Sequence, residues 1–114
     1  MTVTIWHNPR CSKSRQTLAL LEARGIAPRV RRYLDRPPSP AELREAARLL
    51  GRPVIAFTRT GEARFRELGL SGESDDETLI AALAENPRLI ERPIVFANGK
   101  AALGRPPEAV LDIL

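Results

Sequence analysis

The segment 93–103, PIVFANGKAAL, constrains the fold more than any other stretch of this chain. It contains two apolar runs joined by Asn98 and Gly99, and this dipeptide is the strongest short-range signal for a two-residue β-hairpin turn. The carboxyl-terminal part of the chain is therefore predicted to contain an antiparallel strand pair. Two prolines follow the hairpin, and residues 108–113 are expected to form a final helix.

The amino-terminal third shows a different pattern, in which one helix separates two strands. Residues 2–6 are expected to form the first strand, and after an Asn-Pro turn a helix is expected from about Ser12 to Arg24. Residues 29–34 are expected to form the second strand, with Val30 facing the core and the arginines facing solvent. This order favours a parallel strand pair.

Helix signals fill the middle of the chain, from about residue 39 to residue 86. Ser39 begins a capping-box pattern, and Gly51 ends the helix that follows it. Ser74 begins a second capping-box pattern, and residues 53–70 are expected to form short helical turns. The element order is thus β-α-β, an all-helical insertion, and β-β-α. This order predicts one α/β domain over residues 1–114, with a thioredoxin-like fold and a helical insertion at about 39–86.

Composition limits the function classes that this chain can serve. The net charge is +4, but the 18 basic residues are scattered among 14 acidic ones, and the chain has only five aromatic residues. A stacking platform for nucleic acid is therefore not expected. No apolar run approaches the roughly 18 residues that span a bilayer. The start of the chain lacks the pattern of a secretory signal, and one cysteine cannot form an internal disulfide, so a cytoplasmic location without a membrane partner is expected.

The only histidine and the only cysteine lie in HNPRCSKSR, residues 7–15. Cys11 is expected where the first strand gives way to the first helix, a place where backbone N–H groups and the helix dipole favour an anion. At a pKa near 8.5 about 3% of a thiol is ionised at pH 7, whereas at a pKa near 6 roughly 90% is ionised. The polar and cationic neighbours of Cys11 therefore predict a reactive thiolate rather than a buried apolar side chain.

The residues around Cys11 limit its chemistry. Cys11 and Ser14 form a C-x-x-S pattern where a thioredoxin has C-x-x-C, so an attached group must be removed by a thiol from another molecule. Ser14 is either a hydrogen-bond donor to the sulfur or a first-turn helix residue. His7 is expected to hold a proton near the thiolate, with a structural role as the alternative. One cysteine and one histidine are too few for a zinc site, so no metal is predicted.

Three motifs resemble those of one family, the glutaredoxin-dependent ArsC arsenate reductases. HNPRCSKSRQTL resembles the opening motif, RFRELGL the middle, and ERPIVFANGKAALGRPPEAVLDIL the carboxyl-terminal motif, so the resemblance extends over essentially the whole chain. It implies a thioredoxin-like fold with a helical insertion and a cis peptide bond before Pro93. The residues to which it assigns roles are Cys11 as nucleophile, His7 as its neighbour, and Arg59, Arg92 and Arg105 as oxyanion-binding arginines.

The resemblance also implies a reaction. Cys11 attacks arsenate, glutathione acts as co-substrate, glutaredoxin is the external reductant, and no cofactor is bound. Arsenate, like phosphate, carries about −1.5 to −2 charges at neutral pH, and planar guanidinium groups bind such oxygens bidentately. Two features depart from the family pattern: Phe65 stands where the family has a tyrosine, and the extension that longer members carry after the last helix is not present.

Two other readings share this fold or this thiol. Spx-type regulators have the same fold and bind RNA polymerase, but they typically keep C-x-x-C and would not need the three arginines. A monothiol redox enzyme acting on glutathione adducts explains Cys11 but leaves the arginines unexplained. The phosphatase-like arsenate reductases require an arginine six residues after the cysteine, and Thr17 stands there. The motifs therefore favour glutaredoxin-dependent arsenate reduction.

Overall fold

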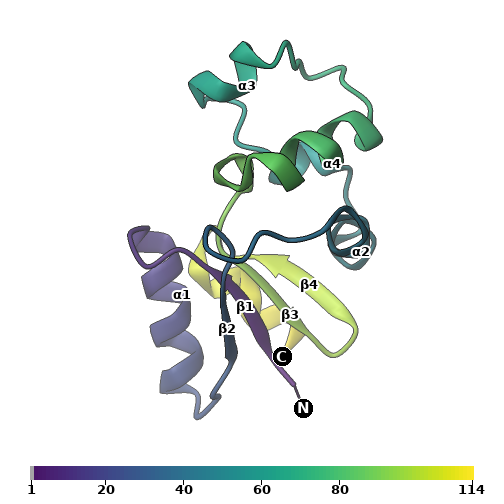
Figure 1. Ribbon diagram of the computed structural model, residues 1–114. Coiled ribbons are helices and arrows are strands. Elements are labelled where there is room, and N and C mark those ends of the chain that lie inside the picture. Colours follow the sequence, from purple (N-terminus) through teal and green to yellow (C-terminus); the bar gives the residue numbers. More distant parts are fainter. Residues whose placement is uncertain (1) are drawn as a thin grey trace. The chain divides into compact units, whose positions relative to one another are not determined.

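A computed structural model describes residues 2–114, and the chain divides into two compact units (Figure 1). The first unit joins the segment that ends at Arg36 to Arg92–Leu114, and it holds the β-sheet. The second unit, Pro37–Glu91, contains only helical elements and the turns between them, apart from one isolated β-bridge. The observed architecture confirms the predicted α/β fold class with an all-helical insertion.

The sheet of the first unit has four strands in the order β2-β1-β3-β4. The strands are β1 (Thr4–His7), β2 (Arg29–Arg32), β3 (Ile94–Ala97) and β4 (Lys100–Leu103). β1 runs parallel to β2 and antiparallel to β3, and β3 forms a hairpin with β4. The parallel pair and the hairpin are both as predicted from the sequence.

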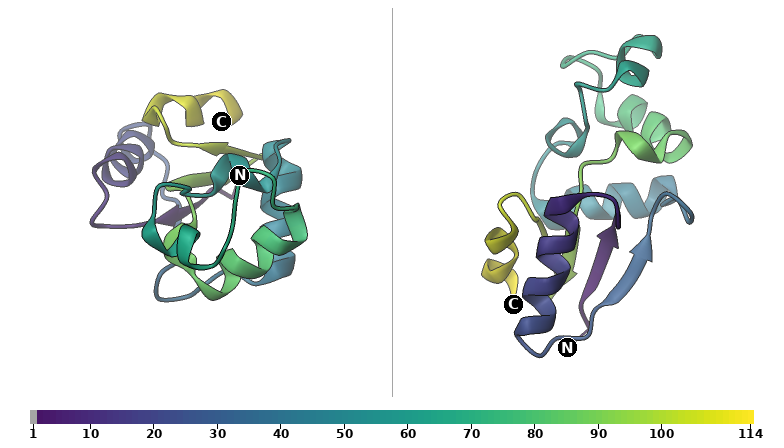
Figure 2. Two further views of the ribbon diagram at one scale, coloured as in Figure 1. Left: turned by 90° about the horizontal axis from the view of Figure 1, so that it is seen from above. Right: turned by 90° about the vertical axis from the view of Figure 1, so that its left-hand side faces the viewer.

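One face of this sheet is covered by α1 (Ser12–Ala23) and η3 (Pro107–Ile113), which lie side by side in the right-hand view of Figure 2. The apolar side chains between them and the sheet are excluded from solvent, which stabilises each large aliphatic residue by about 1.5–3 kcal/mol. The fully buried members of this core are Ile5, Leu21, Val95 and Val110. The final helix is a 3₁₀ helix rather than the expected α-helix, because a short segment that begins with proline tightens to i→i+3 hydrogen bonds.

The orientation predicted for Val30 is wrong in one respect. Val30 is the register partner of Ile5 and thus shares its face of the sheet, but its side chain is 47% exposed. β2 is the outer strand of the sheet, whereas the buried core residues gather over β1 and β3. An alternating pattern shows which face a residue occupies, but the position of its strand in the sheet decides how much of that face is covered.

The second unit is built from five short helices. They are α2 (Pro40–Leu50), η1 (Val54–Phe57), α3 (Ala63–Glu67), α4 (Asp76–Glu85) and η2 (Pro87–Leu89). Helix α4 contacts α2, η1 and η2, so it is the central element of this unit. The buried apolar residues of the second unit include Leu43, Ala46, Val54, Phe57, Leu79, Leu83 and Leu89.

Capping interactions define the helix starts in this unit. The predicted capping box is present at α2, where the Ser39 hydroxyl accepts from the Glu42 amide at 3.1 Å and the Glu42 carboxylate accepts from the Ser39 amide at 2.9 Å. The second predicted box is wrong by one residue. Helix α4 is capped by Asp75, whose carboxylate accepts from the Thr78 amide at 2.8 Å. The Ser74 hydroxyl instead accepts from the Ser71 amide at 3.0 Å. Aspartate and serine are equally good caps, so the sequence alone did not separate them.

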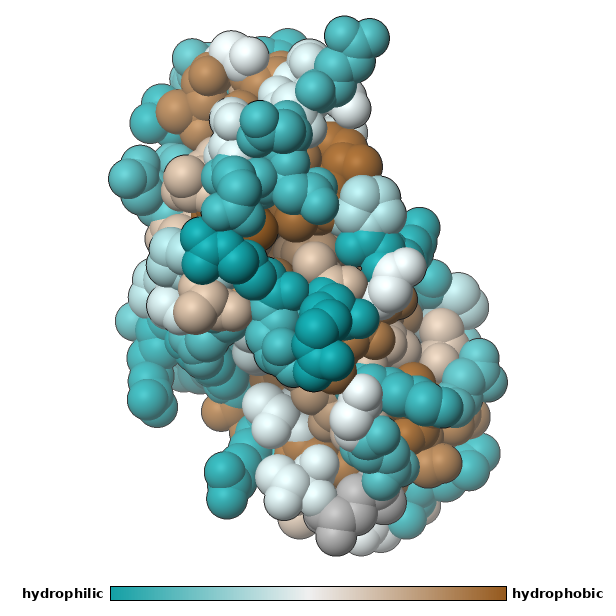
Figure 3. All heavy atoms as spheres, turned by 90° about the vertical axis from the view of Figure 1, so that its right-hand side faces the viewer, coloured by the Kyte–Doolittle hydropathy of each residue, from teal (hydrophilic) through white to brown (hydrophobic). Residues whose placement is uncertain are grey.

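Hydrophilic side chains are spread over the face of the molecule drawn in Figure 3, with smaller apolar patches between them. Within residues 2–114, no helix combines the length and the apolar character needed to cross a bilayer.

The hairpin meets the first helix at Gly104. A Cβ atom at Gly104 would lie 2.6 Å from Pro93 Cγ and 2.6 Å from the Thr17 hydroxyl oxygen. In real proteins a Cβ atom essentially never comes within 3.0 Å of such a neighbour. The Gly104 amide also donates to the Pro93 carbonyl at 2.9 Å, and the Thr17 hydroxyl donates to the Lys13 carbonyl at 2.8 Å. Only glycine lets these three segments come together at the first turns of α1.

We expect Gly104→Ala to lower the free energy of unfolding by about 1–3 kcal/mol, because the added methyl group must push apart a fully packed contact. Chemical denaturation followed by circular dichroism measures this loss. Gly61→Ala is the matched control, since no atom lies within 4 Å of its built Cβ. Equal denaturation midpoints for the two variants would show that the Gly104 contact relaxes without loss of stability.

Candidate active site

Cys11 lies at the N-cap of α1, as predicted from the sequence. A tight turn carries the chain there from the end of β1: the Cys11 amide donates to the Asn8 carbonyl at 3.0 Å, and the Arg10 amide donates to the Asn8 side-chain oxygen at 3.0 Å. The residue as a whole is only 8% exposed. The turn therefore places a nearly buried sulfur at the positive end of a helix.

The pKa of Cys11 reflects opposing effects. Burial of the thiol is the largest single effect and raises the pKa, but the backbone amide of Ser14, the charge of Arg92 and the amide of Lys13 together lower it below its usual value. A direct hydrogen bond from the Arg92 guanidinium adds to the lowering. The amides make no capping hydrogen bond of regular geometry with the sulfur, so they act mainly through their partial charges. Cys11 therefore carries more thiolate at neutral pH than an ordinary cysteine.

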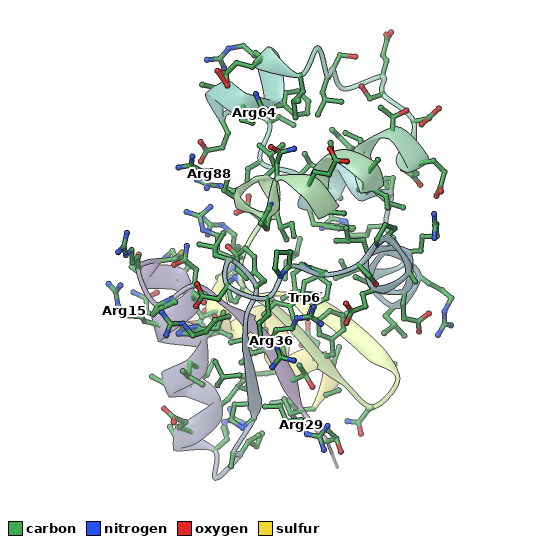
Figure 4. The ribbon with its side chains drawn as sticks, in the orientation of Figure 1. Trp6, Arg15, Arg29, Arg36, Arg64 and Arg88 are labelled. Atoms are coloured by element: carbon green, nitrogen blue, oxygen red, sulfur yellow. The ribbon has the colours of Figure 1, made fainter. Side chains whose placement is uncertain are left out.

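The surroundings of His7 disfavour the positive charge that the sequence suggested. Its ring is 6% exposed, and burial together with the nearby charges of Arg32 and Arg15 lowers its pKa, so the ring is neutral at neutral pH. Figure 4 labels Arg15 beside the start of α1. Burial first, and the two arginines second, thus disfavour a proton on His7 next to the thiolate, and the catalytic role of His7 stays a prediction.

The Ser14 hydroxyl forms its hydrogen bonds with His7 and Asn8 rather than with the Cys11 sulfur. Ser14 is fully buried, its Oγ lies 2.6 Å from His7 Nδ1, and it accepts from the Asn8 amide at 3.0 Å. Of the two readings left open by the sequence, the structure supports a first-turn helix residue whose backbone amide, rather than its hydroxyl, acts on Cys11. The turn at Asn8 was predicted from the sequence, but the hydrogen bond from its amide to the Ser14 hydroxyl was not.

Arg92 and Arg105 come together at the same end of the sheet. Arg92 precedes β3 and acts on the Cys11 sulfur, and the Arg105 guanidinium donates to the Arg92 carbonyl at 3.0 Å. The peptide bond before Pro93 is cis, as the resemblance implied, and the bond before Pro106 is cis as well, which no sequence feature indicated. Of the three predicted arginines, Arg92 thus acts directly on Cys11, and Arg105 is hydrogen-bonded to Arg92.

Arg59 lies in the second unit and has a different environment. Its guanidinium forms an ion pair with Glu62 at 2.6 Å and donates to the Arg88 carbonyl at 3.4 Å. The two paired side chains are about 30% exposed, 28% for Arg59 and 31% for Glu62. Phe65, which stands in place of the family tyrosine, is buried in this unit. The role predicted for Arg59 stays a prediction.

The geometry around Cys11 suits nucleophilic attack on an anion. A thiolate normally repels a negatively charged electrophile, but Arg92 lies at the sulfur and can neutralise an oxygen of the incoming group. No group of three or more potential metal-ligating side chains is present within residues 2–114.

We expect Arg92→Ala to raise the pKa of Cys11, because it removes both a nearby positive charge and a hydrogen bond from the thiolate. The pH dependence of alkylation by iodoacetamide, a neutral reagent, measures this pKa. Arg29→Ala removes the same charge from an exposed position of β2 and should leave the pKa unchanged. An identical pH profile for the Arg92 variant and the wild type would show that Arg92 does not stabilise the thiolate.

Comparison with known proteins places this site in a family. The ArsC family model matches residues 6–113. The chain is 50% identical to the uncharacterized protein YfgD of Escherichia coli K12 over 98% of its length and 96% of that protein. It is 48% identical to an arsenate reductase of Neisseria meningitidis serogroup A, over 98% of this chain and 97% of that one. A solved structure, the arsenate reductase from Vibrio cholerae, superposes with a TM-score of 0.96 at 54% identity and covers 100% of this chain and 98% of its own. The chain belongs to the ArsC family and has its thioredoxin-like fold.

Proposed function

We propose that this protein is an arsenate reductase that uses Cys11 as its nucleophile, with glutathione and glutaredoxin as external reductants. The observation that carries the proposal is the thiol at the N-cap of α1, with its pKa lowered and the Arg92 guanidinium beside it. Relatives named arsenate reductase, with 48% and 54% identity over nearly the full chain, support arsenate as the substrate.

In the first step the Cys11 thiolate attacks arsenic and forms a sulfur–arsenic bond, and one arsenate oxygen leaves as water after protonation. Arg92 neutralises the arsenate oxygens during this attack, and Arg105 positions Arg92 through its hydrogen bond to the Arg92 carbonyl. The neutral His7 ring holds the Ser14 hydroxyl and so fixes the first turn of α1, whose amides stabilise the thiolate. Arg59 is proposed as a third ligand of the oxyanion.

In the second step glutathione condenses with the arsenic, and a second molecule of water is lost. A glutaredoxin thiolate then attacks the glutathione sulfur and forms a mixed disulfide with it. The bond between the glutathione sulfur and arsenic breaks, and its electron pair stays on arsenic. Arsenic is thereby reduced from the five-valent to the three-valent state, and two thiols are oxidised to one disulfide. Hydrolysis releases arsenite and restores the Cys11 thiolate. An external thiol is required, since the chain has one cysteine only.

We expect Cys11→Ser to reduce turnover to the uncatalysed background, because a serine hydroxyl is not ionised at neutral pH. The measurement is NADPH consumption with arsenate, glutathione, glutaredoxin and glutathione reductase, in which each component is omitted in turn. Circular dichroism confirms that the variant is folded. Equal arsenate reduction by the variant and the wild type would rule out this mechanism.

We expect Glu62→Gln to lower the KM for arsenate by about two- to fivefold, because Glu62 competes with the oxyanion for the Arg59 guanidinium and partly exposed ion pairs are worth only about 0.2–1 kcal/mol. Steady-state kinetics at varied arsenate concentration measure this change.

Glu67→Gln is the matched control for this test, since it removes the same charge from a looser pair with Arg64, at 3.8 Å, in the same unit. A higher KM for the Glu62 variant would instead show that Glu62 positions Arg59, and an unchanged KM would argue against oxyanion binding by Arg59.

A further inference from the structure

A hollow of about 260 Å³ lies next to the loop that precedes Cys11. One side is formed by the end of β1 and the loop after it, and the other by the end of β2 and the turn after it. β1 and β2 are neighbouring parallel strands, and α/β proteins bind ligands outside the carboxyl ends of such strands. The residues that line the hollow are His7, Asn8, Pro9, Arg10, Arg32, Leu34 and Asp35.

The rim of the hollow carries both signs of charge. Arg32 forms an ion pair with Asp35 at 3.4 Å, and their side chains are 62% and 65% exposed. Arg10 is also exposed and adds a second guanidinium. An exposed ion pair of this length contributes little to stability, so a ligand with complementary charges can replace it at small cost. Two cations and one anion together match a ligand that has two carboxylates and one ammonium group.

His7 links the hollow to the helix that carries Cys11. It lines the hollow and is only 6% exposed. Its Nδ1 lies 2.6 Å from the Ser14 hydroxyl oxygen, and Ser14 belongs to the first turn of α1. The hollow therefore borders a residue that is directly hydrogen-bonded to the start of this helix.

The position of the hollow relative to Cys11 selects the kind of ligand. Its lining ends at Arg10, and the next residue is the nucleophile. An extended residue spans about 3.3–3.6 Å, so a peptide of two or three residues held here by its charged end is long enough to extend along the loop toward Cys11. The volume is slightly below the roughly 300–1,000 Å³ typical of complete small-molecule sites, which suits one end of such a peptide rather than its whole length.

We propose that this hollow binds the charged end of the external thiol, a short acidic peptide of the glutathione type, and directs that thiol to the group attached to Cys11. This inference rests on the proposed function for the need of an external thiol. Arg10 and Arg32 bind the carboxylates of the peptide, and Asp35 binds its ammonium group. The pair between Arg32 and Asp35 opens when the peptide enters.

A disulfide-exchange assay tests this site without arsenate. Cys11 is first converted to its 2-thiopyridyl disulfide, which is a uniform adduct because the chain has one cysteine. A glutathione thiolate then attacks the Cys11 sulfur and releases 2-thiopyridone, whose absorbance gives the rate. The diethyl ester of glutathione has the same thiol without the carboxylate charges. The measured quantity is the ratio of the two rates, at about pH 8, where His7 is neutral in every variant.

We expect the wild type to favour glutathione over its diethyl ester, and Arg32→Ala to reduce this ratio by about five- to tenfold through loss of a charge-assisted contact. Asp35→Asn should reduce the preference for glutathione over N-acetylglutathione, which lacks the ammonium group. Arg29→Ala is the matched control: Arg29 lies at the opposite end of β2, as Figure 4 shows, and its replacement should leave both ratios unchanged.

The outcomes separate this inference from the proposed function. Equal ratios for Arg32→Ala, Arg29→Ala and the wild type would overturn the binding site, even if the wild type reduces arsenate. A ratio that falls only in the Arg32 variant would establish the site, even if the wild type reduces no arsenate. In that second case the proposed substrate is wrong, while the acidic thiol remains a partner of Cys11.

Discussion

The close packing at Gly104 is the contact on which the site depends. The absence of a side chain at Gly104 lets the end of β4 pack directly against Pro93 and against Thr17 of α1. Arg92 and Arg105 flank this contact along the chain, and the hydrogen bond between them holds the two ends of the hairpin together. A side chain at this position would have to displace Pro93 or Thr17, because protein interiors have little spare volume to take it up.

The charges that favour the thiolate are ones that do not change with pH near neutrality. Burial opposes ionisation of Cys11 and raises its pKa, and it is outweighed by fixed backbone amides and by the Arg92 guanidinium, which lower that pKa. A histidine cation in the same role would be lost as the pH rises through about 6.5. His7 is instead kept neutral by burial and by two arginines, and it acts as a hydrogen-bonding partner of Ser14.

Local patterns in the sequence predicted what depends on neighbours in the chain. The hairpin turn, the capping box at Ser39 and the position of Cys11 at a helix start all follow from a few adjacent residues, and the structure confirms each of them. The lowered pKa of His7 could not be read from the sequence, because it depends first on burial and then on Arg32, which is distant in the chain and adjacent only through strand pairing. The exposure of Val30 depends in the same way on the position of β2 at the sheet edge.

In the proposed mechanism, the order of strands would let one sulfur react with two anions in succession. Cys11 follows β1, which lies between β2 and β3 in the sheet. Arg92 leads into β3 on one side, and Arg32 ends β2 on the other, so the two cations flank the strand that leads to the thiol. An oxyanion bound at Arg92 and an acidic thiol bound at Arg32 would each be neutralised at its own place. If a single cluster of cations served both, the first anion would use up the charge that the second requires, and the second would approach against repulsion. Placing the two clusters on opposite neighbours of β1 avoids this competition and needs only one cysteine between them.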